Sequence, residues 1–398
     1  VMRPPEAALF FSPMLISYFV VAWHIVCKSK LIFLYFKIRI FLLVMSQMDD
    51  LKNLDDNSPH PVDLAQIKFY LQKGDAKLAL NSSQILLAED PNQVQVLLFA
   101  TIAARSMGWL DEAFTYANNA TMVAPDQPAA FSLLGDILLL QKKPNDALDI
   151  LLHAHKLGDH TAQNYFNIGS AYMCLEAFEK ATLHFNHALE INPNMVVAHV
   201  NKGLVAHSLM NLNEAIGCFD AALQIDPDNV DAKWNKSHIL LAQGKYQEGL
   251  KLYETRWKNP KIRLKKRSLS SSLWLGQEDL SGKTVLLFAE GGFGDTFQFI
   301  RYAKLFEPDV KLIIQCQLPL IELVRGMGLD AEIITPGDTP PPHDFHCPLM
   351  SLPRAFRYSP ESFSTREQYL FPSKRKKARF KSAYGKQGRP RIGLVIEG

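Results

Sequence analysis

Cysteine is scarce in this sequence and is never paired at short range. The 398 residues contain five cysteines, which stand far apart and form no C-x-x-C pair. Structural zinc sites and disulfide frameworks use closely spaced thiols, so the sequence argues against both kinds of site. Unpaired cysteines also fit a reducing compartment. The five are Cys27, Cys174, Cys218, Cys316 and Cys347.

An excess of one charge sign is also missing. Lysine and arginine number 43 against 40 aspartates and glutamates, which gives a formal net charge of +3. Net charge therefore does not indicate a nucleic-acid partner. The basic run at residues 374–377 has no interleaved aromatic residues, so we expect it on the exposed face of a helix and predict no nucleic-acid binding.

Metal-ligand clusters are not evident either. Six histidines lie on predicted repeat helices, but their pairs lack carboxylate or cysteine companions. Since zinc needs three or four ligands, we expect solvated or packed histidines and no metal. They are His153, His155, His184, His187, His199 and His207.

Long apolar runs are confined to the first 45 residues. Residues 8–27 are almost wholly apolar and long enough to span a bilayer. Three interpretations of residues 1–48 stay open: an over-extended gene start, a membrane anchor, or a signal peptide that lacks a small-residue cleavage site. The first makes the protein cytoplasmic. The second anchors it to the inner membrane, facing the cytoplasm. Membrane binding is expected only under this second interpretation.

A period of 34 residues runs through residues 60–260 without insertion. Alanine recurs at one position, and proline or an equivalent twelve residues later. This pattern resembles the tetratricopeptide repeat (TPR), in which helix pairs stack because one pair cannot bury its apolar face alone. We therefore predict an α-solenoid of six copies, the first and last of them degenerate. The copies begin at His60, Val94, Pro128, Ala162, Val196 and Val230.

Asparagine occupies the same position in three successive repeats, at Asn167, Asn201 and Asn235. Regular stacking would align these residues along the concave face, where an amide can pair with an extended peptide backbone. This ladder resembles that of O-linked GlcNAc transferase and implies a protein or peptide partner. The alternative is that each amide bonds only a neighbouring turn.

The composition changes after the repeats. Residues 261–275 are basic and then serine-rich, as in a linker, and residues 276–390 alternate apolar runs with helical patterns. This alternation predicts a parallel sheet in a Rossmann-like α/β domain. Strands are expected at 284–289, 310–316, 332–335 and 345–347, and another at 391–396.

A glycine-rich turn, residues 290–296, follows the first of these strands. Its spacing is neither the G-x-G-x-x-G of dinucleotide binders nor a P-loop. Its glycines permit a tight turn and close approach of the backbone to a ligand. Asp295 or Thr296 can cap the helix that follows. The N-terminus of that helix favours anions. The alternative is a plain turn in which Asp295 is only a helix cap.

Three motifs together resemble bacterial TPR proteins with a glycosyltransferase-like domain. They are residues 253–257, 290–302 and 346–353, and that domain is similar to the heptosyltransferases of GT-B fold. The resemblance implies sugar transfer from a nucleotide-sugar, a co-substrate with no further cofactor, to a protein or glycan. In that family a second Rossmann-like domain carries most of the donor site. Residues 391–398 would begin it, so we expect this chain to be truncated and incomplete.

The resemblance also implies site roles. Asp295 maps to the base that takes the proton of the acceptor hydroxyl, and His346, after a strand end, would line the same cleft or make only a turn contact. The other implied substrate-binding residues are Gly291, Gly292, Gly294, Thr296 and Gln298. The alternative function is a non-catalytic TPR scaffold for protein–protein interaction.

Overall fold

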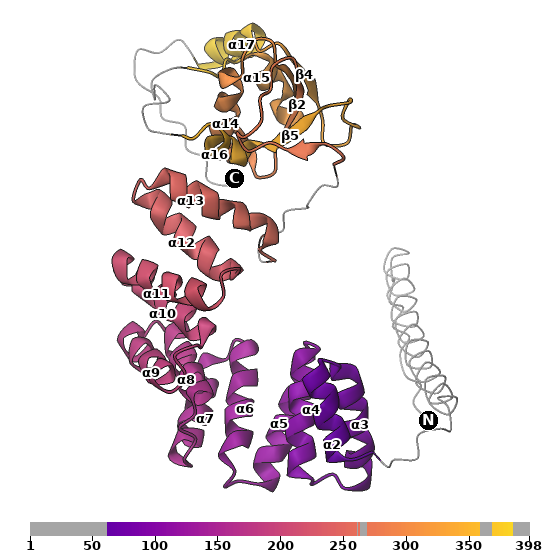
Figure 1. Ribbon diagram of the computed structural model, residues 1–398, viewed down its shortest axis with the longest axis vertical. Helices are drawn as coiled ribbons and strands as arrows, with labels where there is room; N and C mark the ends of the chain where they lie inside the picture. Colours follow the sequence, from indigo (N-terminus) through magenta and orange to yellow (C-terminus); the bar gives the residue numbers. More distant parts are fainter. Residues whose placement is uncertain (1–61, 261, 263–268, 359–367, 385–398) are drawn as a thin grey trace, which may run out of the picture.

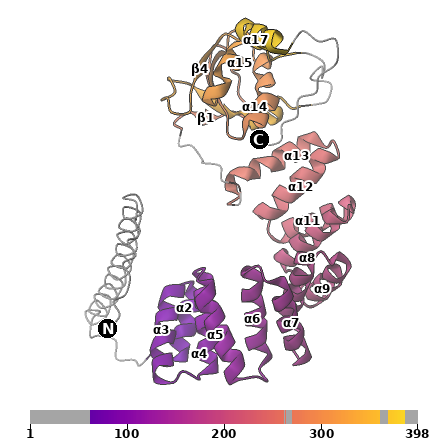
Figure 2. The same cartoon turned by 180° about the vertical axis from the view of Figure 1, so that it is seen from behind.

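The computed structural model describes residues 62–260, 262, 269–358 and 368–384. They form a curved array of helix pairs with an α/β domain at one end, as Figures 1 and 2 show from opposite sides. The predictions for residues 1–48 and 391–398 lie outside the described residues. Among the described ones, no helix is long and apolar enough to cross a membrane.

Six helix pairs follow the 34-residue period, which confirms the predicted solenoid. The last pair continues into a 3₁₀ turn, η1 (Glu254–Lys258), that leads toward the α/β domain. The pairs are α2 (Leu64–Lys73) with α3 (Ala76–Glu89), α4 (Val94–Ser106) with α5 (Leu110–Val123), α6 (Pro128–Leu140) with α7 (Pro144–Lys156), α8 (Ala162–Cys174) with α9 (Phe178–Ile191), α10 (Val196–Ser208) with α11 (Leu212–Ile225), and α12 (Val230–Ala242) with α13 (Tyr246–Tyr253).

Small residues let the two helices of a pair approach closely. A Cβ atom added at Gly169 would lie 2.8 Å from the Phe185 ring, and one at Gly203 would lie 2.7 Å from the Phe219 ring. The alanines that recur with the period are fully buried. Dense packing of this kind leaves no room for an extra methyl group, which explains why the small residues repeat.

The curvature of the array assigns its inner face. First helices of successive pairs contact one another, from α2 against α4 to α10 against α12, whereas the second helices stay farther apart. In a curved stack the more closely spaced helices line the concave side (Figure 1). The concave face therefore consists of α2, α4, α6, α8, α10 and α12.

The α/β domain contains one five-stranded parallel sheet in the order β1-β5-β2-β3-β4, which confirms the predicted Rossmann-like architecture. Its first strand lies inside the segment predicted as a linker, because that short strand forms by pairing with the distant β5. The strands are β1 (Ser272–Leu273), β2 (Thr284–Phe288), β3 (Lys311–Gln315), β4 (Ala331–Ile334) and β5 (Phe345–Pro348).

The helices of this domain pack on one face of the sheet. There Val285, Leu287 and Ile314 form a buried core with the helices, while Leu286 and Ile313 on the opposite face meet Leu269. Both faces are covered, which explains the uninterrupted apolar strands. The helical segments are α14 (Phe293–Phe299), η2 (Ile300–Leu305), η3 (Leu318–Leu320), α15 (Ile321–Arg325), η4 (Leu349–Ser351), α16 (Leu352–Ala355) and the exposed α17 (Lys374–Tyr384).

A group of histidines and tyrosines packs where α7, α8 and α9 meet. The ring of His184 stacks on Tyr172 at 5.5 Å between centroids and lies 6.0 Å from Tyr165. Its Nδ1 is buried and has no hydrogen-bond partner in the part of the chain that the structure describes. Burial lowers the pKa of His184 below its ordinary value of 6.5, and nearby His187 and His155 lower it further.

Replacing His184 with phenylalanine should make the stability of the array less sensitive to acid. Because the folded-state pKa is the lower one, the unfolded chain binds more protons near and below pH 6.5, so stability falls as the pH falls through this window. Phenylalanine keeps the stack on Tyr172 but cannot titrate. We expect the melting temperature to drop less for the variant than for the wild type between about pH 7.5 and about pH 5.5. Equal drops in melting temperature for the two proteins would contradict a lowered pKa of His184 in the folded state.

Candidate functional site

The strand order reverses between β2 and β5. From β2 the chain moves outward through β3 to β4, and β5 then returns to the other side of β2. In open parallel sheets, ligands bind in the crevice outside the carboxyl ends of the strands at such a reversal. The glycine loop follows β2 and η4 follows β5, so these two segments border the candidate site.

An arginine from the helical array occupies this point. Arg256 of η1 is 1% exposed, and its Nη2 donates to Glu290 Oε1 at 2.8 Å and to Ser351 Oγ at 2.6 Å. Its Nε donates to the same Glu290 oxygen at 3.2 Å, and Nη1 pairs with Glu254 Oε1 at 3.1 Å. One guanidinium therefore joins the array to the ends of β2 and β5.

The charges in this cluster are largely removed from water. The Glu290 side chain is 2% exposed, and burial raises its pKa to about 7 although Arg256 acts in the opposite direction. Burial also disfavours the charged form of Arg256, yet its pKa is raised because Glu254 and Glu290 flank it. Arg256 is held further between the rings of Tyr253 and Trp257, at 5.1 and 5.0 Å from their centroids.

Asp295 lies in the first turn of α14 and is half-buried. Its Oδ2 accepts a hydrogen bond from the Gly292 N–H at 2.9 Å. The helix begins at Phe293 with Gly292 as its N-cap, so neither Asp295 nor Thr296 is the predicted N-cap, and Asp295 bonds back to the N-cap residue from inside the first turn. A Cβ atom on Gly291 would lie 2.2 Å from the same oxygen, so a larger residue there would displace the Asp295 carboxylate. α14 contacts η4, which holds Ser351, the hydrogen-bond partner of Arg256. This places Asp295 near the end of the array, and its role as a base stays a prediction.

The neighbours of Asp295 differ in how accessible they are. Thr296 is 1% exposed, and its hydroxyl donates to Gln317 Oε1 at 3.0 Å, while Gln317 Nε2 donates to the Gly291 carbonyl at 3.0 Å. Thr296 thus ties the loop to the segment after β3. Gln298, Gly292 and Gly294 are exposed.

His346 lies on the other side of the sheet. It is the second residue of β5 rather than a residue after its end, and its ring lies 6.1 Å from that of Phe288. Its Nδ1 is 2.9 Å from Ser271 Oγ, and burial lowers its pKa, with His343 adding to the effect. The structure therefore does not bring His346 together with Asp295, because α14 packs on the opposite face.

The three asparagines of the predicted ladder lie on α8, α10 and α12, which line the concave face. Each has a partner within the array: Asn167 Oδ1 accepts from Gln163 at 2.9 Å, Asn201 Nδ2 donates to Ser170 at 3.4 Å, and Asn235 Nδ2 donates to the Asp231 carbonyl at 2.8 Å. Asn167 is also buried, at 2% exposure. Local bonding is thus present in all three, and peptide binding by them stays a prediction.

Sequence reasoning assigned no role to Arg256, Glu290 or Ser351. The available signal was that each residue belongs to a different one of the three motifs behind the family resemblance. In the structure these motifs meet in one buried cluster.

Comparison with known proteins supports the repeat assignment. The tetratricopeptide repeat model matches residues 162–195 and 196–229. A UDP-N-acetylglucosamine–peptide N-acetylglucosaminyltransferase of Giardia intestinalis is 26% identical over 28% of this chain and 7% of its own length. The human protein O-mannosyl-transferase TMTC3 is 30% identical over 29% of this chain and 13% of its own. The chain spans 21% of the length of the human tetratricopeptide repeat protein 13 and 50% of that of the protein FlbA of Caulobacter vibrioides.

Among solved structures, the array is similar to YrrB, described as a TPR protein with an unusual peptide-binding site. The two share 18% identity over 44% of this chain and 89% of that one, with a TM-score of 0.36.

Proposed function

We propose that this chain, a TPR-repeat protein whose helix-pair array is followed by a parallel α/β domain, holds a protein or peptide for glycosyl transfer at that domain. The observation that supports this proposal most is the Arg256 cluster. It fixes the end of the array to the strand reversal, next to the loop with Asp295. A peptide on the concave face would run toward that loop.

The chemistry assigned to the loop is transfer with inversion. Asp295 accepts the proton of the acceptor hydroxyl, whose oxygen bonds to the anomeric carbon of a nucleotide-sugar as the nucleoside diphosphate leaves. Gly292 and Gly294 are exposed and leave the backbone accessible, while Thr296 holds the loop in place. The curated relatives support this class, since one transfers a sugar to peptide and another is a protein O-mannosyl-transferase by name.

The direct test offers the protein a panel of labelled nucleotide-sugars together with a display library of peptides. We expect one donor to give labelled peptide and free nucleoside diphosphate in equal amounts. Absence of transfer from every donor, with no donor raising the melting temperature, would contradict the enzyme proposal.

A non-catalytic scaffold is the second candidate. The favouring observation is that the polar groups at the loop already have internal partners: Asp295 caps Gly292, and Thr296 bonds Gln317. In this case the array alone supplies the function, and the α/β domain serves as a docking platform.

Replacing Asn167, Asn201 and Asn235 together with alanine should weaken peptide capture. Each lost amide hydrogen bond is worth roughly 1 kcal/mol, so we expect the triple variant to bind a peptide selected on the wild type about 10- to 100-fold more weakly. A matched control replaces Asn119, Asn186 and Asn213, which lie on second helices, and should bind as the wild type does. Unchanged capture by the first variant would remove the ladder from the proposal.

A further inference from the structure

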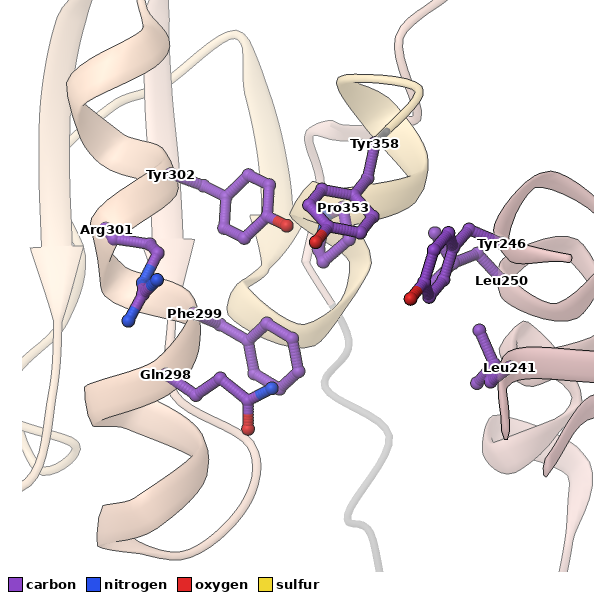
Figure 3. Close-up of a pocket in the computed structure, with 9 residues that line it drawn as sticks. All are labelled: Leu241, Tyr246, Leu250, Gln298, Phe299, Arg301, Tyr302, Pro353 and Tyr358. Atoms are coloured by element: carbon purple, nitrogen blue, oxygen red, sulfur yellow. The ribbon is translucent and has the colours of Figure 1, made fainter. Parts of the chain in front are cut away.

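A cleft of about 520 Å³ lies between the last helix pair and the α/β domain. Figure 3 shows its two walls: Tyr246 and Leu250 of α13 face Phe299 and Tyr302 of the α/β domain across the gap. Its volume is within the usual range for small-molecule sites, which occur preferentially at domain interfaces.

Aromatic rings line this cleft from one wall to the other. The ring centroids of Phe299 and Tyr302 are 6.5 Å apart, those of Tyr302 and Tyr358 are 6.2 Å apart, and those of Tyr358 and Tyr246 are 5.0 Å apart. The side chain of Gln247 also donates to the Tyr358 carbonyl at 2.9 Å, which holds the walls together. The surface offered to a ligand is therefore mainly apolar and preformed.

Among the described residues that line the cleft, Arg301 is the one that carries a charge. Its guanidinium stacks on the Tyr369 ring at 4.3 Å, and its Nη2 donates to the Tyr369 hydroxyl at 2.9 Å. That hydroxyl in turn donates to the Phe297 carbonyl at 2.7 Å. These contacts hold the cation in place without neutralising its charge.

Within the described part of the chain, Arg301 pairs with no carboxylate. Among the described residues its buried Nε has no hydrogen-bond partner, and its Nη2 donates to the Tyr369 hydroxyl rather than to a carboxylate. Tyr302 is the next residue in the chain, and burial raises the pKa of its hydroxyl. Tyr302 therefore stays neutral and does not act as a counter-ion for Arg301. An immobilised cation in an apolar cleft favours an anion that accepts hydrogen bonds from its N–H groups.

We propose that this cleft binds an amphipathic carboxylate, a ligand with an apolar ring and one carboxylate group that pairs with Arg301. The ring would pack against Tyr246, Phe299 and Tyr358, and Gln298 would offer its amide to the ligand's polar atoms. The proposal does not depend on sugar transfer. Its ligand is either a free small acid or an acidic, ring-bearing segment of a peptide held by the array.

The test titrates the full chain with phenylbutyrate and with its uncharged amide, followed by ligand-observed NMR. We expect the carboxylate to bind at least about tenfold more tightly than the amide, and Arg301→Gln to abolish that difference. Arg325→Gln removes an exposed arginine outside the cleft and should preserve it. Equal binding of the two probes to the wild type, or a difference that survives in Arg301→Gln, would overturn the proposal.

A second variant tests the site from the opposite wall. Tyr246→Ala removes an aromatic side chain of the array but no charge, so the affinities of phenylbutyrate and of its amide should fall by a similar factor. If neither probe weakens, they do not bind in this cleft and the proposal fails. Competition with a peptide selected on the array separates the two sources: displacement of phenylbutyrate assigns the cleft to the peptide, and simultaneous binding assigns it to a free acid.

Discussion

Replacing Arg256 with methionine should lower the free energy of unfolding by about 3–5 kcal/mol, because it leaves two carboxylates facing each other without their cation. Glu290 has 2% of its side chain exposed and Glu254 has 14%, so water cannot take the place of the guanidinium. Ser351, fully buried, loses a hydrogen-bond donor at the same time. Methionine fills most of the space, which limits the contribution from a cavity.

Urea unfolding followed by tryptophan fluorescence measures this loss. Trp257 contacts Arg256, and Trp274 is buried in the core of the α/β domain. Fluorescence therefore follows unfolding both at the end of the array and in the α/β domain. Arg325→Met, at an exposed position, serves as the control and should change stability by less than about 0.5 kcal/mol.

The double variant Arg256→Met with Glu290→Gln isolates the ion pair. Burying a neutral glutamine beside methionine costs less free energy than burying a carboxylate there. The loss of unfolding free energy in the double variant should therefore be smaller than the sum of the two single-variant losses, by at least about 1 kcal/mol. A single-variant loss below about 1 kcal/mol, or strictly additive losses, would show that the cluster does not hold the array to the domain.

Replacing Asp295 with asparagine should reduce sugar transfer by about 10²- to 10⁴-fold, the usual contribution of a positioned general base. The amide oxygen of asparagine can still accept the hydrogen bond from the Gly292 N–H, so the turn should persist and stability should change by less than about 0.5 kcal/mol. The measurement is kcat/KM with the donor and peptide identified in the panel, alongside the melting temperature.

Two further variants separate catalysis from capping. Asp295→Ala removes both functions and should lose the same activity together with about 1 kcal/mol of stability. Asp309→Asn alters an exposed carboxylate that likewise accepts a hydrogen bond from a glycine N–H, that of Gly282 at 3.0 Å, and should leave activity unchanged. If Asp295→Asn is as active as Asp309→Asn, Asp295 is only a helix cap.

The repeat array could be predicted from the sequence because its information is local and periodic. Each pair repeats the same close approach, such as Gly169 against Phe185, so a small residue returns every 34 positions. The central strands β2 and β3 were also predictable, since burial on both faces requires an uninterrupted apolar run. Burial patterns did not determine where helices begin: α14 starts at Phe293, before Asp295, which bonds back to Gly292 from inside the first turn.

The site depended on contacts that no local pattern contains. β1 forms by pairing with a strand more than 70 residues later in the chain, and the face of β5 on which His346 lies follows from the register of that pairing. Arg256 meets Glu290 and Ser351, which are 34 and 95 residues away in sequence. Periodicity and composition specify the elements, because they reflect burial one residue at a time. Which side chains share a buried crevice depends on how complete elements pack, and that geometry is set by the folded chain as a whole.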